Sequence, residues 1–348
     1  MLLARQIARS LEQGRDGPLS SVIATGWGEI ARRRLVKELR FRPGASVLAV
    51  GGATLGGSGK TPLALACTEV LATLGARVAF VGHAYGARPG AARIVRVDDD
   101  LRVVGDEALL AARTLASLGV PVIVAPSRQA ALDLALMHAD IAVLDGVAQV
   151  APVPAHLALL AVDGARPWGA GRCPPCGDLR APERDLLEVC DRVVSFGAMS
   201  TLTGQRAGVD ADVLEARCAG AWAADVLLDW DTLGRRRVGL WTSLARPERV
   251  VGMLQSYGIR TVVTMAQGDH EVATARSQRE LIERGRAVGV EVWVSTPKCA
   301  LSLPPTLGEV PVAILRRELT LPTGLTEALS RLRMQSQAVD AGRNGLVL

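Results

Sequence analysis

A glycine-rich segment that ends in a lysine and a threonine is the part of the sequence that most clearly indicates chemistry. Its residues are Gly56, Gly57, Ser58, Gly59, Lys60 and Thr61. Glycines let consecutive backbone N–H groups turn toward phosphate oxygens, and the N-terminus of a following helix favours negative charge. In such a phosphate-binding loop, Lys60 reaches the terminal phosphates of a nucleotide and the Thr61 hydroxyl can bind Mg²⁺. Thr54 stands where the strict motif has its first glycine.

Acidic residues that could bind the metal occur in two places. Asp145 follows the apolar run 141–144, and Asp106 and Glu107 follow a glycine at the start of a predicted helix. A carboxylate directly after a buried strand lies at the edge of the sheet where the nucleotide loop also begins. Two adjacent acids can divide the work, since one can accept a proton while the other holds Mg²⁺. Asp106 has an alternative interpretation as a helix cap.

The elements that would position these residues alternate between short apolar runs and helical periods. The apolar runs are 47–50, 78–81, 120–124, 141–144, 157–162 and 193–195, and the helical periods between them are 61–74, 106–118 and 128–138. Short, β-branched runs separated by helices are typical of a parallel sheet covered on both faces. We therefore predict an α/β fold, a P-loop NTPase-like doubly wound parallel sheet.

A second, smaller α/β domain is predicted after a polar, irregular stretch. Strand patterns recur at 238–242, 261–265 and 290–294, with helical patterns from Pro247 and over 274–287. We expect residues 1–205 to contain an N-terminal amphipathic helix and the P-loop domain. The rest is predicted as a hinge over 206–236, the smaller domain over 237–318 and a helical tail over 319–348. The expected site lies in the cleft between the domains, where hinge closure would exclude water.

The predicted N-terminal helix, residues 19–40, combines an apolar stripe with a basic end. Leu19, Val22, Ile23, Ile30, Leu35 and Leu39 form the stripe, with Trp27 beside it, and the cations are Arg32, Arg33, Arg34, Lys37, Arg40 and Arg42. Such a helix can lie in a membrane interface with its arginines on anionic headgroups. It can equally pack on its own core and expose a solvated basic face.

Composition excludes several classes of protein. Among 348 residues, 49% are hydrophobic and 22% charged, as in a folded globular chain, and aromatic residues at 3% are too few for a base-stacking surface. The net charge of +5 suits an anionic small molecule or a membrane surface as well as nucleic acid. No apolar run is long enough to span a bilayer, and the N-terminus lacks a signal-peptide core. Six scattered cysteines indicate reduced thiols, and the pair Cys173 and Cys176 lacks further ligands at zinc spacing.

The order and spacing of these motifs resemble the tetraacyldisaccharide 4'-kinase family, from about residue 17 to 300. The segment from Val50 to Pro62 is similar to the family's VGNxTVGGTGKTP, which has the same threonine at the position of Thr54. The family's other motifs are SRGYG, GDEP, an arginine, DDGxQH, a glycine-rich DGxRG segment, NPERF, PDHH and TEKD. They resemble Gly82–Gly86, Gly105–Ala108, Arg128, Asp145–Val150, Asp163–Arg172, Arg246–Arg249, Gly268–Glu271 and Thr296–Cys299.

The resemblance implies transfer of the γ-phosphate of ATP to the 4'-hydroxyl of a tetraacyldisaccharide 1-phosphate, at the cytoplasmic face of a bacterial inner membrane. By this analogy Asp106 is the base and His270 its partner, while Lys60 acts on the phosphates. Glu107, Asp145 and Thr61 would surround Mg²⁺, and Gln149, Arg128 and Tyr85 would contact the acceptor. The implied ligands are ATP, Mg²⁺ and an anionic lipid presented at the membrane surface, with no nucleic acid.

The chain departs from the family pattern at several positions. Gly146 replaces the second aspartate of DDG, Val150 the following histidine, His83 the arginine of SRGYG and Cys299 the aspartate of TEKD. Because Lys60 and the acidic residues remain, a minimal set for phosphoryl transfer is present. The alternatives are a catalytically impaired nucleotide-binding relative with a regulatory or scaffold role, and a P-loop kinase of a soluble sugar.

Overall fold

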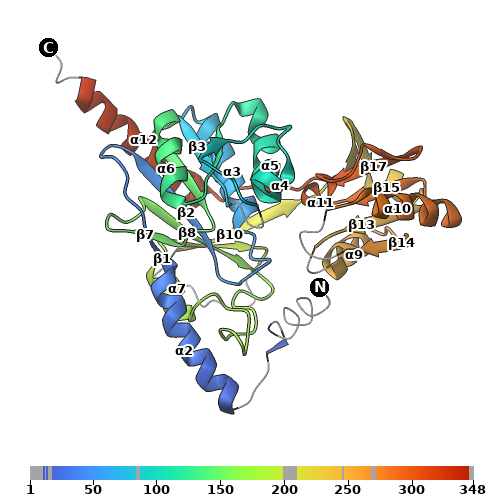
Figure 1. The fold of residues 1–348 in the computed structure, drawn as a ribbon, viewed down its shortest axis with the longest axis horizontal. Helices are drawn as coiled ribbons and strands as arrows, with labels where there is room; N and C mark the ends of the chain where they lie inside the picture. The colour runs from blue at the N-terminus through green and yellow to red at the C-terminus, as the bar shows by residue number, and fades with distance from the viewer. Residues whose placement is uncertain are drawn as a thin grey trace. The chain divides into compact units, whose positions relative to one another are not determined.

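The structure, a computed structural model, describes residues 11, 13–14, 18–83, 87–198, 210–244, 247–267 and 272–344. Two compact units emerge, each with its own sheet (Figure 1). The larger unit lies within Ile7–Glu215 and Leu319–Leu348, and the smaller unit within Ala216–Glu318. No helix in the described ranges has the length and apolar character that crossing a bilayer requires.

The larger unit is built on a sheet of nine strands among the described residues. Their order is β18-β10-β9-β8-β2-β6-β3-β5-β4. From β10 to β5 neighbouring strands are parallel, and β4 joins antiparallel. In chain order the bounds are β2 Ser46–Gly52, β3 Val78–Val81, β4 Arg93–Ile94, β5 Val122–Val124, β6 Ile141–Asp145, β8 Leu157–Asp163, β9 Arg192–Phe196, β10 Asp210–Arg217 and β18 Glu318–Thr320. Each strand predicted for this sheet is confirmed.

Helices cover both faces of this larger sheet, as expected for a buried parallel sheet. They are α3 Lys60–Thr73, α4 Leu101–Val104, α5 Asp106–Leu115, α6 Arg128–His138, α7 Glu183–Glu188 and α12 Thr323–Asn344, with a 3₁₀ turn at Ala116–Leu118. Leu132 and Leu136 of α6 pack in one buried cluster with Val47 and Ala49 of β2. The fully buried strands thus hold the loops at their carboxyl ends on a rigid base.

The smaller unit contains a mixed sheet in the order β12-β11-β17-β15-β13-β14, with β16 paired to β17. The strand bounds are β11 Gly220–Ala223, β12 Val226–Asp229, β13 Val238–Thr242, β14 Thr261–Ala266, β15 Val292–Ser295, β16 Thr306–Leu307 and β17 Val310–Leu315. The helices are α8 Trp230–Gly234, α9 Pro247–Ser256, α10 Ala275–Val288 and α11 Pro297–Ala300. The strands and helices predicted for this region are confirmed.

Trp293 explains two glycines in the core of the smaller unit. Its side chain is 1% exposed and packs over β13 and α10. A Cβ on Gly239 would come within 2.7 Å of this ring, and one on Gly285 within 2.9 Å. Only glycine therefore allows the helix and the neighbouring strand to approach the indole so closely.

The helix predicted over 19–40 is shorter than expected. Helix α2, Pro18–Leu35, ends where Val36–Glu38 becomes strand β1. Strand β1 pairs in parallel with β7, Gln149–Ala151, in a separate two-stranded sheet. The prediction was wrong over 36–40 because a partner strand from elsewhere in the chain outweighs the local helical period.

The helices and strands described above do not test the predicted domain boundaries. Strand β10 belongs to the larger sheet, whereas β11, β12 and α8 belong to the smaller unit. All four lie wholly or mainly in the stretch 206–236, whose action as a hinge stays a prediction. The helical tail predicted over 319–348 contains α12, which is grouped with the larger unit.

Candidate functional site

The glycine-rich loop runs from the end of β2 into the first turn of α3. Gly59 is the N-cap of α3 with φ 85°, in the left-handed region, and no side chain of the described residues caps the helix there. A Cβ on Gly59 would also come within 2.3 Å of Phe196. The Thr54 hydroxyl donates a hydrogen bond to the carbonyl of Gly56 at 2.7 Å, so Thr54 bridges the turn where the strict motif has glycine. The helix N-terminus is thus left open to an anionic ligand.

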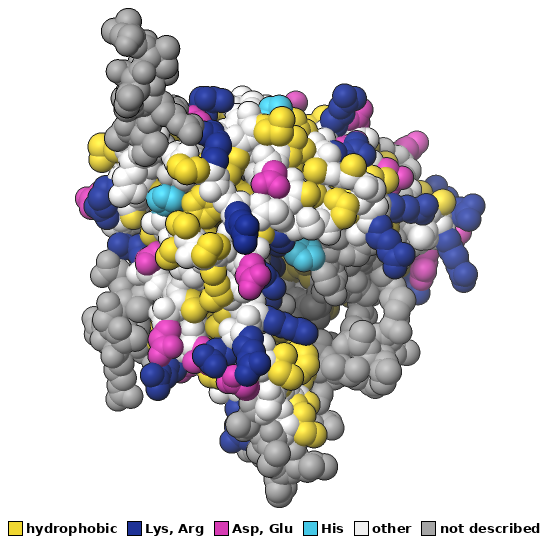
Figure 2. Space-filling model, turned by 60° about the vertical axis from the view of Figure 1, so that its left-hand side comes forward, with side chains coloured by type: hydrophobic (Ala, Val, Ile, Leu, Met, Phe, Trp, Pro, Cys, Tyr) yellow, Lys and Arg dark blue, Asp and Glu magenta, His cyan; other side chains and the backbone are white. Residues whose placement is uncertain are grey.

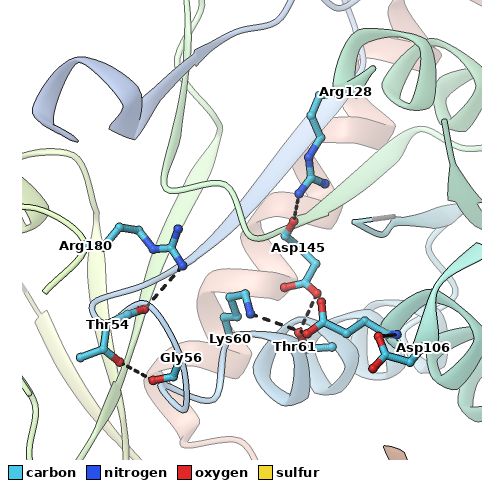
Figure 3. Close-up of polar contacts among 9 residues, drawn as sticks. Thr54, Gly56, Lys60, Thr61, Asp106, Arg128, Asp145 and Arg180 are labelled. Atoms are coloured by element: carbon cyan, nitrogen blue, oxygen red, sulfur yellow. Dashed lines mark hydrogen bonds and ion pairs between the residues drawn. The ribbon is translucent and has the colours of Figure 1, made fainter. Parts of the chain in front are cut away.

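Three strand and helix ends bring charged side chains together beside this loop (Figure 3). Val50 of β2 pairs with Asp145 of β6, which places the carboxylate next to the loop. The Thr61 hydroxyl donates to Oδ2 of Asp145 at 2.7 Å. Lys60 Nζ lies 3.9 Å from Oε1 of Glu107, the second residue of α5. The predicted phosphate-binding loop, Lys60, Glu107 and Asp145 therefore lie close together.

Asp145 carries the clearest sign that this place takes a ligand. Its side chain is fully buried, and Oδ1 has no hydrogen-bond partner among the described residues. Burial raises the pKa of Asp145; Lys60 and the Thr61 hydrogen bond oppose this rise, and Glu107 adds to it. A buried carboxylate oxygen with no donor suits a hard cation, and a hydroxyl with one or two carboxylates is the set Mg²⁺ uses with phosphates and water. The residues present therefore fit Mg²⁺.

Asp106 lies at the start of α5, next to Glu107. Its side chain is 9% exposed, and Oδ1 accepts a hydrogen bond from the backbone N–H of Glu107 at 2.8 Å. The preceding Gly105 has φ 86°, which turns the chain sharply into the helix. The structure thus places both acids at one helix start, while the roles predicted for them remain predictions.

Arg128 holds two strand ends together. Its guanidinium donates to the carbonyl of Gly82 at 3.1 Å and to that of Asp145 at 2.7 Å. Burial lowers its pKa, and Asp145 and Glu107 oppose this effect. Gly146, with φ 77°, lies against the same side chain, because a Cβ there would be 3.3 Å from an Arg128 nitrogen. These contacts position the site, and the predicted contact between Arg128 and the acceptor stays a prediction.

His83, where the resembling family has arginine, lies in the same surroundings. Burial and the nearby Arg128 lower its pKa, against the opposing charge of Glu107. The lowered pKa favours the neutral imidazole, which does not supply the fixed positive charge of an arginine.

Gln149 is engaged by the backbone around it. Its amide nitrogen donates to the carbonyl of Val189 at 3.1 Å, and its oxygen accepts from the N–H groups of Val150 and Ala155. The structure does not bring it into hydrogen-bond contact with the charged cluster, and its contact with substrate stays a prediction. Tyr85 and His270 lie outside the described residues.

Arg180 is a site residue that sequence reasoning missed. Its guanidinium donates to the carbonyl of Gly52 at 3.2 Å. It also donates to the carbonyl of Thr54 at 3.5 Å (Figure 3), and the backbone N–H of Arg180 donates to the carbonyl of Ala53 between them. Burial lowers its pKa, and Asp145 opposes this effect. Leu179 also forms a bridge with Thr54. No periodicity or motif of the Pro-rich stretch 173–182 signals this contact, which arises only on folding.

A phosphate-binding loop after the central β2, with a buried aspartate ending the adjacent β6, defines a P-loop nucleotide-binding protein. A family model, "Tetraacyldisaccharide-1-P 4'-kinase", matches residues 18–333. The chain therefore belongs to the tetraacyldisaccharide-1-phosphate 4'-kinase family, and the resemblance stated above is confirmed.

Individual relatives agree with this assignment. A tetraacyldisaccharide 4'-kinase of Methylobacterium radiotolerans is 35% identical over 293 residues, which are 83% of this chain and 84% of that protein. One of Brucella ovis is 30% identical over 88% of each chain. A crystal structure of LpxK from Aquifex aeolicus in complex with ATP is similar with a TM-score of 0.68 and 20% identity. It covers 96% of this chain and all of that one, and shows that the two share a fold.

Proposed function

We infer that the protein transfers the γ-phosphate of ATP to the 4'-hydroxyl of a tetraacyldisaccharide 1-phosphate in lipid A biosynthesis. The observation that carries this inference is the buried Asp145 at the phosphate-binding loop. Its Oδ2 accepts the Thr61 hydroxyl, and its Oδ1 has no partner in the part of the chain that the structure describes. Membership of a family defined by this reaction gives the acceptor.

The chemistry required is mainly positioning and neutralisation of charge, because phosphoryl transfer needs little covalent help from the protein. We propose that the open N–H groups at the start of α3 and the Lys60 ammonium hold the terminal phosphates. Mg²⁺, held by Thr61, Asp145 and Glu107, would supply further neutralisation of the phosphate oxygens. Arg128 and Arg180 keep the strand ends and the loop in register through backbone carbonyls.

Asp106 is proposed as the base that orients the 4'-hydroxyl and accepts its proton. It is a buried carboxylate next to Glu107, whose side chain lies near Lys60, so the base and the phosphate-binding lysine belong to one cluster. His270 is proposed as its partner on the strength of the family pattern. A positioned base contributes about 10²–10⁴-fold to such a reaction. No observation favours the impaired relative that the altered motif positions suggested.

The test is transfer of label from ATP to a tetraacyldisaccharide 1-phosphate in mixed micelles with Mg²⁺. We expect turnover by the native protein, a loss of about 10²-fold or more in Asp106→Asn, and no loss in Asp98→Asn, which changes an exposed acid of the same unit. Binding of ATP without transfer to this acceptor would refute the proposed function. Transfer that survives Asp106→Asn would refute the role of Asp106 alone.

Helix α2 provides the features for contact with a membrane. Ile23, Trp27 and Ile30 recur at helical spacing and are 51%, 41% and 48% exposed, while Ala31 and Leu35 are buried in the larger unit. Arg32, Arg33 and Arg34 lie in its last turn. In Figure 2, hydrophobic and basic side chains lie together in the lower part of the face shown, with acidic side chains among them. We propose that this surface associates with the anionic inner membrane that presents the lipid.

Sedimentation with vesicles of anionic lipid tests this surface. Changing Ile23, Trp27 and Ile30 together to serine should abolish sedimentation and leave the free energy of unfolding nearly unchanged, because the three side chains are exposed. Serine at Met137, which is 75% exposed on α6, is the matched control and should sediment like the native protein. Equal sedimentation of the triple variant and the native protein would rule out α2 as the contact.

A further inference from the structure

The end of the phosphate-binding loop lies against an aromatic side chain from another strand of the larger sheet. Phe196 is the last residue of β9, which is two strands away from β2, and its side chain is half-buried. A Cβ on Gly59 would lie 2.3, 2.6 and 2.8 Å from three carbon atoms of the Phe196 ring. The ring therefore occupies the space that a side chain at position 59 would need.

Gly59 is the residue at which the loop passes into helix α3. Its φ is 85°, and its carbonyl accepts the backbone N–H of Leu63 at 3.0 Å. Because glycine has no Cβ, its backbone can leave this left-handed conformation at little steric cost. The loop binds phosphate only while its N–H groups point toward the ligand. A ring that fills the space beside Gly59 leaves fewer other conformations open to it.

Hydrogen bonds on both sides of Phe196 hold its backbone in place. Its carbonyl accepts the N–H of Gly164, directly after β8, at 3.0 Å, and the N–H of Gly197 donates to the carbonyl of Leu214 in β10 at 3.2 Å. The buried Ser195 hydroxyl donates to the carbonyl of Gly197 at 2.7 Å. The end of β9 is thus tied to both neighbouring strands, and the ring has a fixed support.

We propose that Phe196 is a positioning residue that keeps Gly59 in its phosphate-binding conformation and thereby raises the affinity for ATP. The proposal rests on the function proposed above, in which this loop holds the phosphates of ATP. Arg180 holds the start of the loop through two backbone carbonyls, and the Phe196 ring holds its end. A loop that is ordered before the nucleotide arrives loses less conformational entropy on binding.

Calorimetric titration with ATP and Mg²⁺, without acceptor, tests the proposal. Phe196→Ala should raise Kd about 10-fold, the scale of ordering the backbone of one residue on binding. Phe196→Leu should raise Kd less, because leucine still fills part of the same space. Phe41→Ala is the matched control, since Phe41 is a half-buried phenylalanine of the same unit that packs near His156 before β2 begins. A native Kd in Phe196→Ala, or an equal rise in Phe41→Ala, would overturn the proposal.

Steady-state kinetics separate positioning of the loop from a general loss of stability. In Phe196→Ala the KM for ATP should rise, and kcat at saturating ATP should change little, because the bound nucleotide then holds the loop itself. A fall in kcat with an unchanged KM for ATP would overturn the proposal. Absence of transfer by a native protein that binds ATP would refute the proposed function, whereas the titration does not require transfer.

A double-mutant cycle tests whether the effect acts through Gly59. Gly59→Ala should weaken ATP binding strongly, because the new Cβ meets the ring and a φ of 85° disfavours a side chain. In a Phe196→Ala background the same change should weaken binding less, since the ring no longer fills the space. An equal loss of affinity in both backgrounds would overturn the proposed contact.

Hydrogen exchange gives an answer that needs no nucleotide. The amide of Leu63 donates to the carbonyl of Gly59, so it should exchange faster in Phe196→Ala than in the native protein. The amide of Leu74 is the control, because it donates to the carbonyl of Val70 at 2.9 Å at the other end of α3 and should exchange at the native rate. Unchanged exchange at Leu63 would refute the positioning role.

Discussion

The carboxyl ends of parallel strands carry buried polar groups in both sheets, but the two sets differ in charge. At the larger sheet, Asp145 is a buried carboxylate with one oxygen bonded to Thr61 and the other without a partner among the described residues. At the smaller sheet, the buried groups are neutral: Ser295 donates to the carbonyl of Trp241, and Ser243 bonds to Cys299.

This difference distinguishes buried polar groups with a functional role from those with a structural role. A buried charge with an open coordination position destabilises the fold unless a ligand completes it, so its presence indicates a function that requires it. Neutral hydroxyl and thiol groups that bond to the nearby backbone stabilise the loops that follow the strands. Three substitutions test this distinction, in order of decreasing expected effect.

The largest effect is expected from Asp145→Asn. Transfer should fall about 10²-fold or more, because the residue proposed to hold the metal is lost. Without Mg²⁺ the variant should be more stable than the native protein at neutral pH, by about 1–3 kcal/mol, because an amide removes the buried charge. Urea unfolding with and without Mg²⁺ measures both states.

The pH dependence of that stability difference has a fixed sign. Burial raises the pKa of Asp145, so the stability linked to its protonated form is complete below the ordinary carboxyl pKa of about 4. It is lost as pH rises through the higher pKa of the folded state. The advantage of Asp145→Asn should therefore grow as pH rises through that value and then level off. A native protein more stable than the variant at every pH would contradict this account.

A smaller effect is expected from Arg180→Met, which removes the guanidinium that bonds to the carbonyls of Gly52 and Thr54. KM for ATP should rise about 10-fold because the loop that binds phosphate loses its brace. Arg180→Lys should recover part of the loss. Arg184→Met is the control, since Arg184 is exposed on α7 and forms an ion pair with Glu188 on the same helix. Native kinetics in Arg180→Met would show that the loop needs no brace.

The smallest effect on activity is expected from Ser295→Ala in the smaller sheet. The buried hydroxyl donates one bond of 2.9 Å to the carbonyl of Trp241, so its loss should cost about 1 kcal/mol of stability. KM for ATP should stay native, as measured by the same assay. A large rise in KM for ATP would contradict the distinction drawn between the two sheets, because it would mean that the smaller sheet also affects nucleotide binding.

Local pattern was sufficient for most of the fold and for the centre of the site. The glycine-rich loop needs only neighbouring residues to specify its turn and the helix start, and Asp145 is placed by the buried strand that it ends. The sequence failed over 36–40, where β1 pairs with Gln149–Ala151 more than a hundred residues away. Such pairing leaves no local signal.

The amino-acid sequence by itself determined the phosphate-binding loop, the aspartate that ends the neighbouring strand and the family to which the chain belongs. Each of these can be recognised from residues that lie close together in the chain. Only the tertiary structure decided that one oxygen of Asp145 has no partner among the described residues, that Arg180 braces the loop and that the Cys299 sulfur accepts hydrogen bonds from Ser243. These features depend on which distant groups meet in the absence of water, where every donor and acceptor needs a partner.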